Sequence, residues 1–228
     1  MRIFIILLVL LGGSISVFGQ NFKASTFHVN GGLSWPDMKP VNSLLQDPDS
    51  CRSINCYGNF RNSFFSFGFG AEGINNRFVW QADGYLYAIA NPGGRSEAFM
   101  LNILQYYYAT FRLGYVISGQ NDGDYAVVIY PYVGGGGGTG QLRLSNDGTD
   151  RFFRFNTFGY MLDAGLSLNT YTRLPGSDQS FKFGGSIGYY LAPASAWSLD
   201  GTTSAEPLPI SPQGLYVRLC LGIGKVDN

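Results

Sequence analysis

The stretch from Gly214 to Gly224 alternates between apolar residues and small or polar ones. The apolar positions are Leu215, Val217, Leu219, Leu221 and Ile223. A period of two predicts a β-strand with two unlike faces. A strand of this kind at the end of a sequence either remains an unpaired edge or pairs with an earlier strand to close a barrel.

Seven earlier segments alternate in the same way, so we expect about eight strands. The segment 101–117 is expected to be the longest. In the segment 125–136, Pro131 and the run Gly134–Gly138 predict a bulge, and residues 142–151 are either a loop or a strand extension. The full set of earlier segments is 27–34, 63–74, 77–90, 101–117, 125–136, 155–169 and 180–192.

The connections between these segments alternate in length. The first and last, residues 35–62 and 193–212, are long and rich in proline. Asn75 and Asn76 are expected to form a two-residue hairpin turn, and residues 118–124 a compact turn. Outer-membrane barrels have long extracellular loops, short periplasmic turns and both termini in the periplasm. The pattern therefore predicts an all-β fold: a single antiparallel, up-and-down transmembrane β-barrel. The soluble alternative is a secreted, lipocalin-like, lipid-binding barrel.

Composition favours the membrane alternative. Charged residues make up only 13% of the 228 residues, aromatic residues make up 16%, and there are 32 glycines. The apolar faces of the strands carry no charged residue, which is typical of a surface in contact with lipid. The formal net charge is zero. No basic stretch suggests a nucleic-acid partner.

The first residues have the pattern of a signal peptide. Arg2 precedes an apolar run from Ile3 to Leu11, and small residues precede a cleavage site between Gly19 and Gln20. A short membrane anchor is the alternative, but the run is shorter than the ~20 residues that a spanning helix needs. We therefore expect a signal peptide over 1–19 and a barrel domain over 20–228.

The polar faces carry three acids and three bases, which would point into the lumen. An unpaired charge is costly in a lumen closed to bulk water, so we expect these residues to form a polar network that plugs the barrel. The alternative is that each is hydrated in a water-filled pore. Arg218 is expected to pair with Asp163 or Asp83. The six residues are Glu72, Asp83, Arg112, Asp163, Lys182 and Arg218.

These features together resemble the small outer-membrane β-barrel proteins of Gram-negative bacteria. That group includes OmpA-like barrel domains and the porin-family barrels common in Bacteroidetes. The resemblance extends from Phe27 to Lys225, and it implies location in the outer membrane, contact with its lipid, and folding by the barrel assembly machinery. Such barrels usually end on an aromatic residue, whereas this chain continues past Ile223 to Asn228.

Few residues point to chemistry. Cys51 and Cys56 are compatible with a disulfide in the first long loop, and equally with free thiols or an unrelated pairing. Cys220 is expected to be a buried thiol on the inner face of the last strand. The single histidine, His28, is expected to bond within the lumen near the periplasmic end. The Gly134–Gly138 run lacks the residues of a phosphate-binding loop.

We therefore expect a non-enzymatic outer-membrane barrel with no metal site and no cofactor. Its role would be structural or would depend on binding of an unidentified extracellular ligand by loops 35–62 and 193–212. Aromatic residues in or near these loops, such as Trp35, Tyr57 and Trp197, are candidates for that binding. A narrow porin-like channel for small or apolar solutes is the alternative within the membrane class.

Overall fold

The protein is almost entirely β-strand in the residues that its computed structural model describes, which are 22–39, 42–43, 63–93, 100–145, 152–192, 198–199 and 213–227. No helix among these residues is long and apolar enough to cross a membrane. The strands are β1 (Lys23–Pro36), β2 (Phe64–Asn75), β3 (Phe78–Gly93), β4 (Met100–Tyr115), β5 (Ser118–Asn121), β6 (Tyr125–Ser145), β7 (Phe152–Arg173), β8 (Gln179–Leu191), β9 (Ser198–Leu199) and β10 (Gly214–Asp227).

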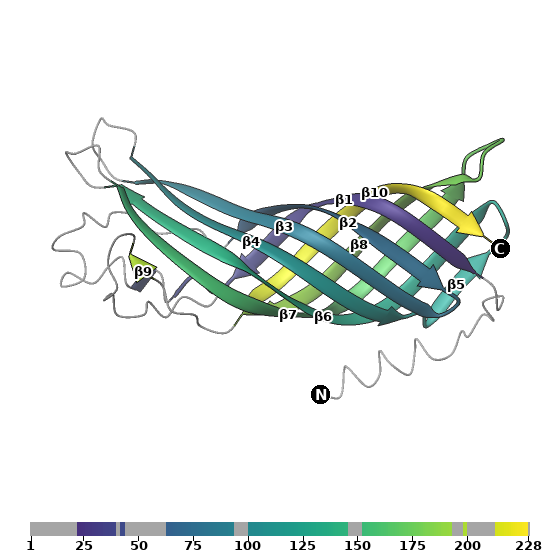
Figure 1. Cartoon of the computed structure of the whole chain (residues 1–228), viewed down its shortest axis with the longest axis horizontal. Helices are drawn as coiled ribbons and strands as arrows, with labels where there is room; N and C mark the ends of the chain where they lie inside the picture. The colour runs from purple at the N-terminus through teal and green to yellow at the C-terminus, as the bar shows by residue number, and fades with distance from the viewer. Residues whose placement is uncertain are drawn as a thin grey trace.

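Eight of these strands close into a barrel (Figure 1). Neighbouring strands follow the order β6-β4-β3-β2-β1-β10-β8-β7, and pairing of β6 with β7 closes the ring. All of the pairings are antiparallel. The predicted fold class is therefore confirmed. The last strand, β10, pairs with β1 and β8, so it closes the barrel and does not remain an unpaired edge.

The two ends of the barrel differ. The C-terminus lies at one end (Figure 1), and there Lys23 of β1 pairs with Asp227 of β10. The tight connections at 76–77, 122–124 and 174–178 lie at this same end. Pro36, Phe64, Leu191 and Gly214, which border the long connections, lie at the other end. Short turns mark the periplasmic end of outer-membrane barrels, so this arrangement agrees with the alternating connection lengths in the sequence.

The first tight turn is shifted by one residue from its expected position. Asn75 ends β2 and pairs with Phe78, so the two turn residues are Asn76 and Arg77. Asn76 has a φ of 58°, in the left-handed region. Asparagine adopts this conformation more readily than most residues, which explains why it occupies the turn.

The predicted bulge lies on a different strand. Gly114 pairs with Tyr132 and Ser118 pairs with Ile129, so three residues on the β4–β5 side face two on β6. This extra residue forms a β-bulge opposite Pro131. Ser118–Asn121 forms β5, which continues the line of β4, so the prediction of a turn over 118–124 is wrong. Only residues 122–124 turn the chain.

Strand β6 runs through the glycine-rich stretch without a break, in register with both β4 and β7. Its glycines allow the neighbouring backbone to come very close, and a Cβ on Gly136 would collide with the carbonyl oxygen of Ala109. The longest strands are β7, with 22 residues, and β6, with 21. The expectation that the 101–117 segment would be longest is therefore wrong.

The outer surface of the barrel is apolar. Phe27, Phe69 and Tyr160 point outward and are 74%, 68% and 68% exposed. Charged side chains on the outer faces of the described strands occur near strand ends, as with Lys23, Arg154 and Lys225. Polar and tyrosine side chains fill the inside, where soluble barrels bury apolar residues. This inverted arrangement suits a lipid environment.

Candidate functional site

The lumen is the only part of the described structure where charged side chains gather away from water. The six predicted charged residues project into it from six different strands, and each is at most 5% exposed. Their places follow from the alternation of each strand, which turns every second residue inward. They are Glu72 on β2, Asp83 on β3, Arg112 on β4, Asp163 on β7, Lys182 on β8 and Arg218 on β10.

Glu72 and Lys182 form an ion pair towards the short-turn end, with Nζ of the lysine 2.9 Å from Oε1 of the glutamate. Tyr171 also donates a hydrogen bond to Oε1, and Tyr130 donates one to Oε2. Asn169 Nδ2 lies 3.3 Å from Oε2 and 2.9 Å from the Tyr130 hydroxyl. The buried carboxylate therefore has four partners, which offsets the cost of removing it from water.

Arg112 links the other two acids in the middle of the barrel. Its Nη1 lies 3.0 Å from Oδ2 of Asp83, and its Nε donates a 2.6 Å hydrogen bond to Oδ2 of Asp163. Nη1 also donates a 2.7 Å bond to the hydroxyl of Tyr85. Tyr216 donates a 2.6 Å bond to the second oxygen of Asp163. One guanidinium thus joins β3, β4 and β7 across the lumen.

Asp83 makes two further hydrogen-bonding contacts with β1. His28 Nε2 lies 2.8 Å from its Oδ1, and Asn30 Nδ2 lies 3.1 Å from the same oxygen. The histidine therefore bonds within the lumen, in keeping with its inward position on β1. Its Nε2 also lies 3.4 Å from the side-chain amide nitrogen of Gln81. These contacts fix the imidazole between two strands.

Arg218 does not pair with an acid among the described residues, so the expectation of a partner in Asp163 or Asp83 is wrong. Its Cζ lies 3.7 Å from the ring centre of Tyr216 and 4.0 Å from that of Tyr85. Its Nη2 donates a hydrogen bond to the hydroxyl of a third tyrosine, Tyr87 on β3. Cation–π contacts with aromatic faces thus take the place of an ion pair.

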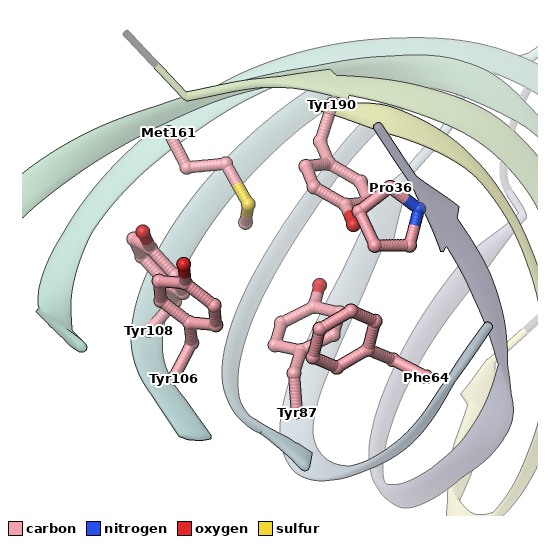
Figure 2. A pocket seen from close by; sticks show the side chains of 7 residues that line it. All are labelled: Pro36, Phe64, Tyr87, Tyr106, Tyr108, Met161 and Tyr190. Carbon is pink, nitrogen blue, oxygen red and sulfur yellow. The ribbon is translucent and has the colours of Figure 1, made fainter. Parts of the chain in front are cut away.

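An aromatic layer occupies the lumen where β1 ends at Pro36 and β2 begins at Phe64, and Figure 2 shows its side chains pointing into the barrel. Tyr106 and Tyr108 stack with ring centres 5.9 Å apart, and Tyr87 lies 5.8 Å from Tyr190. The cavity between these side chains is about 10 Å³, which is room for about one water. Its lining residues are Pro36, Phe64, Tyr87, Tyr106, Tyr108, Met161 and Tyr190.

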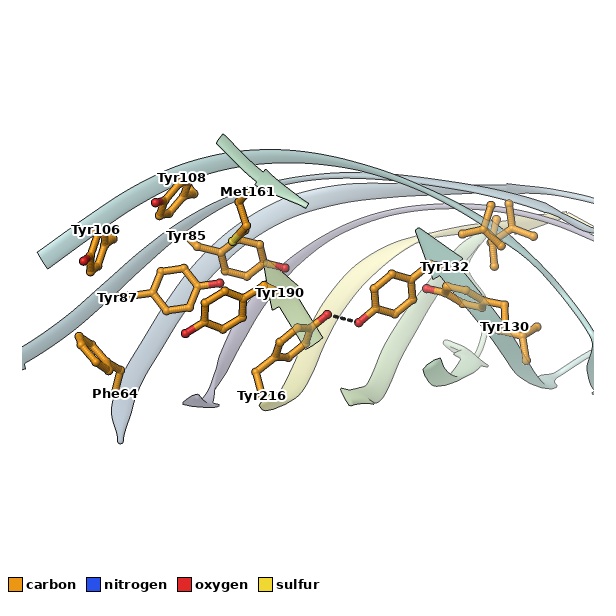
Figure 3. Packing of buried hydrophobic residues seen from close by; sticks show 14 of the residues in the cluster. Phe64, Tyr85, Tyr87, Tyr106, Tyr108, Tyr130, Tyr132, Met161, Tyr190 and Tyr216 are labelled. Atoms are coloured by element: carbon orange, nitrogen blue, oxygen red, sulfur yellow. Dashed lines mark hydrogen bonds between the residues drawn. The ribbon is translucent and has the colours of Figure 1, made fainter. Parts of the chain in front are cut away.

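Tyrosine side chains connect this layer with the part of the lumen that lies nearer the short turns (Figure 3). The rings of Tyr190 and Tyr216 stack with centres 6.1 Å apart, and the hydroxyls of Tyr216 and Tyr132 share a hydrogen bond. Tyr132 then contacts Tyr130 with ring centres 6.4 Å apart. The hydroxyls of Tyr216 and Tyr130 donate to Asp163 and Glu72, while the four rings fill the space between the charged clusters.

The sequence predicted the six charged residues of the lumen but not the tyrosines that contact them. Each of Tyr85, Tyr130, Tyr171 and Tyr216 makes a hydrogen bond or ring contact with at least one of the six charged residues. The available signal was the alternation itself, since each occupies an inward position of its strand. Tyrosine occurs on both faces of these strands, so its inward positions alone did not point to a role.

Those of the remaining candidates that the structure describes show no arrangement for chemistry. Cys220 is a buried, free thiol on the inner face of β10. Cys51, Cys56, Tyr57 and Trp197, the expected signal peptide over 1–19 and most of loops 35–62 and 193–212 lie outside the described residues. Trp35, assigned to a loop by the sequence, lies in the last part of β1 and points outward. The described residues contain no group of three or more His, Cys, Asp or Glu that could hold a metal.

No family model and no curated protein sequence matches the chain. Solved structures of similar fold include Ail of Yersinia pestis in complex with a heparin analogue, which is 12% identical, covers 92% of this chain and 100% of its own, and has a TM-score of 0.41. Neisserial surface protein A is 13% identical over 90% and 96%, with a TM-score of 0.35. A major outer membrane protein from Thermus thermophilus is 10% identical over 89% and 99%, with a TM-score of 0.45.

These TM-scores are below 0.5, so the assignment of a membrane barrel rests on the features of this structure. The barrel is closed, so the membrane meets no open strand edge where all eight strands pair. Its outer face is apolar between the strand ends, and its charges lie inside. Eight antiparallel strands with short turns at one end are typical of small outer-membrane barrels. The chain is therefore an integral outer-membrane protein of the small, eight-stranded β-barrel type.

Proposed function

We propose that this protein is a non-enzymatic, non-conducting barrel that acts through its extracellular loops. The observation that carries the proposal is the filling of the lumen. Buried side chains from all eight strands occupy it, and the cavity in its aromatic layer has a volume of only about 10 Å³. Eight-stranded barrels are wide enough for little more than their own side chains. A rigid barrel of this kind supports loops without passing solutes.

The electrostatics of the lumen support a closed state. Glu72 and Lys182 neutralise each other, and Arg112 lies between two aspartates. The positive charge of Arg218 balances the remaining negative charge in the described lumen. Moving any of the paired side chains aside would leave a buried charge without its partner, at a cost of about 3–5 kcal/mol. The polar network therefore acts as a plug.

Conductance across a planar bilayer tests the plug. We expect the purified protein to show no stable open states in salt solution. A variant with Tyr87→Ala, Tyr106→Ala and Tyr190→Ala would remove three rings from the aromatic layer while leaving the ion pairs intact. Its conductance is compared with that of the unmodified protein. Large, stable openings of the unmodified protein would reject the plug and favour the narrow, porin-like channel.

The loop-mediated role needs a separate test. Replacing residues 38–62 by a short Gly/Ser turn leaves β1 and β2 complete, because these strands end at Pro36 and begin at Phe64. Cells displaying the intact or the shortened protein are then compared for binding to panels of glycans and extracellular proteins. Binding that depends on the loop supports the proposal. Equal behaviour of both proteins towards every ligand leaves the barrel with a structural role alone.

A soluble, lipocalin-like carrier does not fit the structure. Such a barrel would hold its ligand in an apolar interior and present polar side chains to water. Here the interior contains three acids and three bases, and residues such as Phe27 and Phe69 are exposed on the outside.

A further inference from the structure

One glycine on the outer face of the barrel leaves a gap in the apolar surface. Gly31 lies on β1 between the outward-facing Val29 and Leu33, and a Cβ built on it would meet no atom within 4 Å. Its backbone is not in the positive-φ region, so the glycine is not required by conformation. The position could carry a side chain, and the absence of one leaves open space.

Other outward-facing glycines of the barrel are covered by neighbouring side chains. A Cβ at Gly73 would collide with the Trp80 ring, and one at Gly84 would meet the Phe69 ring at 3.5 Å. The same is true of three further glycines on β6 and β8. The covering side chains there are Leu162 at Gly135, Phe158 at Gly137 and Leu219 at Gly185.

Leu219 explains why the gap at Gly31 stays open. It lies on β10 between Gly31 and Gly185, pairing with both. Its Cδ2 comes within 3.7 Å of a Cβ at Gly185, whereas no atom of it comes within 4 Å of one at Gly31. On the other side, Phe67 of β2 pairs with Gly31 but also leaves it uncovered.

The gap is part of a groove of about 590 Å³ on the outer surface. Gly31 and Gly32 form its floor, and side chains of β2 and β10 form its walls. From Val29 to Trp35 it follows β1 for about 20 Å, at about 3.3 Å per residue. Since barrel strands tilt by about 40°, this is a depth of about 15 Å, or half of a ~30 Å hydrocarbon core. The walls are Phe65, Phe67, Val217, Leu219 and Leu221.

We propose that this groove binds one acyl chain of an outer-leaflet membrane lipid. The groove begins near the middle of β1 and ends at Trp35, at the long-connection end of the strand. With these connections extracellular, as in the proposed function on which this inference rests, the groove spans the outer leaflet. It is continuous with the lipid-contacting surface of the barrel, and its walls are entirely apolar. An acyl chain lying on Gly31 makes the contacts with Phe67 and Leu219 that a side chain would otherwise make.

A second copy of the chain is a weaker occupant. Two apolar protein surfaces gain nothing from the hydrophobic effect when they meet in lipid, so helices and barrels associate there through close packing and hydrogen bonds. Among the residues that line the groove, Asn30 points into the lumen, and the Trp35 indole N–H at its end is the one side-chain hydrogen-bonding group that faces outward. A flexible acyl chain fills an irregular groove without such bonds.

Photolabelling of the full-length protein in bilayers tests the proposal. The probe is a phospholipid with a diazirine near the middle of one acyl chain, mixed into phosphatidylethanolamine and phosphatidylglycerol vesicles. Labelled residues are located by mass spectrometry. We expect several-fold more label on Leu33, Val217 and Leu219 than on Tyr107 and Leu162, which face lipid on other strands.

Two variants complete the design. Gly31→Leu fills the groove, and we expect it to lower the label on Val217 and Leu219 to the level of the other strands. Gly84→Leu adds the same side chain where Phe69 already covers the surface, and we expect it to leave the groove label unchanged. Folding of each variant is checked by heat-modifiable migration on gels.

Three outcomes would overturn the proposal. Label spread evenly around the wild-type barrel would show that the groove holds no preferred chain, and this result does not depend on either variant folding. An unchanged pattern in folded Gly31→Leu protein would place the lipid elsewhere. A wild-type dimer that dissociates on Gly31→Leu substitution, measured by light scattering, would make a second copy the occupant.

Discussion

The buried pair of Glu72 and Lys182 gives the sharpest test of how the lumen is stabilised. At their separation of 2.9 Å, the direct attraction is about 6 kcal/mol for an effective dielectric constant of about 20. Desolvation of both groups offsets much of this. The variant Lys182→Met keeps a similar volume and leaves the carboxylate with its tyrosine and asparagine donors. Removing one partner of a buried pair usually costs about 3–5 kcal/mol, and the remaining donors place the expected loss near 3 kcal/mol.

The assay is urea unfolding of the protein in phospholipid vesicles, followed by tryptophan fluorescence and by heat-modifiable migration. Glu72→Gln and the double variant complete a double-mutant cycle, for which we expect a coupling energy of about 2–3 kcal/mol because the double variant buries no unpaired charge. Lys225→Met is the matched control. This lysine is exposed near the end of β10, so its loss should change the free energy of unfolding by no more than about 0.5 kcal/mol.

Two results would refute this reasoning. The first is a Lys182→Met protein with the same stability as the Lys225→Met control. The second is a cycle in which the single effects add to within about 0.5 kcal/mol, which would mean that the two groups are independent. In either case the lysine would be solvated in the lumen, and the closed-lumen proposal would lose its electrostatic support.

Further predictions concern the central cluster, the lipid face and the first turn. Arg112→Met should cost about 3–5 kcal/mol, because it leaves Asp83 and Asp163 without their shared cation, and adding Asp163→Asn should recover part of the loss in the same unfolding assay. Leu221→Arg, near the middle of β10, should destabilise the barrel in vesicles by about 2–4 kcal/mol more than Leu221→Ala; equal losses would mean that this face does not meet lipid. Asn76→Val should lower stability by about 1–2 kcal/mol while Asn76→Gly should not, and the reverse order would contradict the left-handed turn.

Much of the fold could be predicted because the barrel exposes one simple pattern. The period-two alternation of β10 assigned Arg218 to the lumen and Leu219 to the lipid face, and the structure agrees. Strand count and connection lengths were enough for topology, since an up-and-down barrel joins each strand to the next. No long-range information was needed for these features.

Strand register and side-chain partners depend on contacts between strands, which the alternation along one strand does not show. The bulge lies at 115–117 because β4 and β5 together are one residue longer than the part of β6 they face, and one strand read alone cannot show this. Arg218 was expected to pair with an acid on the basis of its charge alone. In the folded lumen its neighbours are the rings of Tyr85 and Tyr216.

The unequal lengths of β7 and β8 locate the membrane boundary. Pairing between them ends at Leu162 and Leu191, while β7 continues back to Phe152 with only β9 pairing on that side. A strand edge with unpaired backbone groups does not occur in lipid hydrocarbon, so the hydrocarbon must end at or below Leu191. The 13 residues of β8 rise about 30 Å at a tilt of about 40°, close to one hydrocarbon thickness. The upper parts of β6 and β7, where Arg154 is exposed on the outer face, therefore extend beyond the hydrocarbon into water.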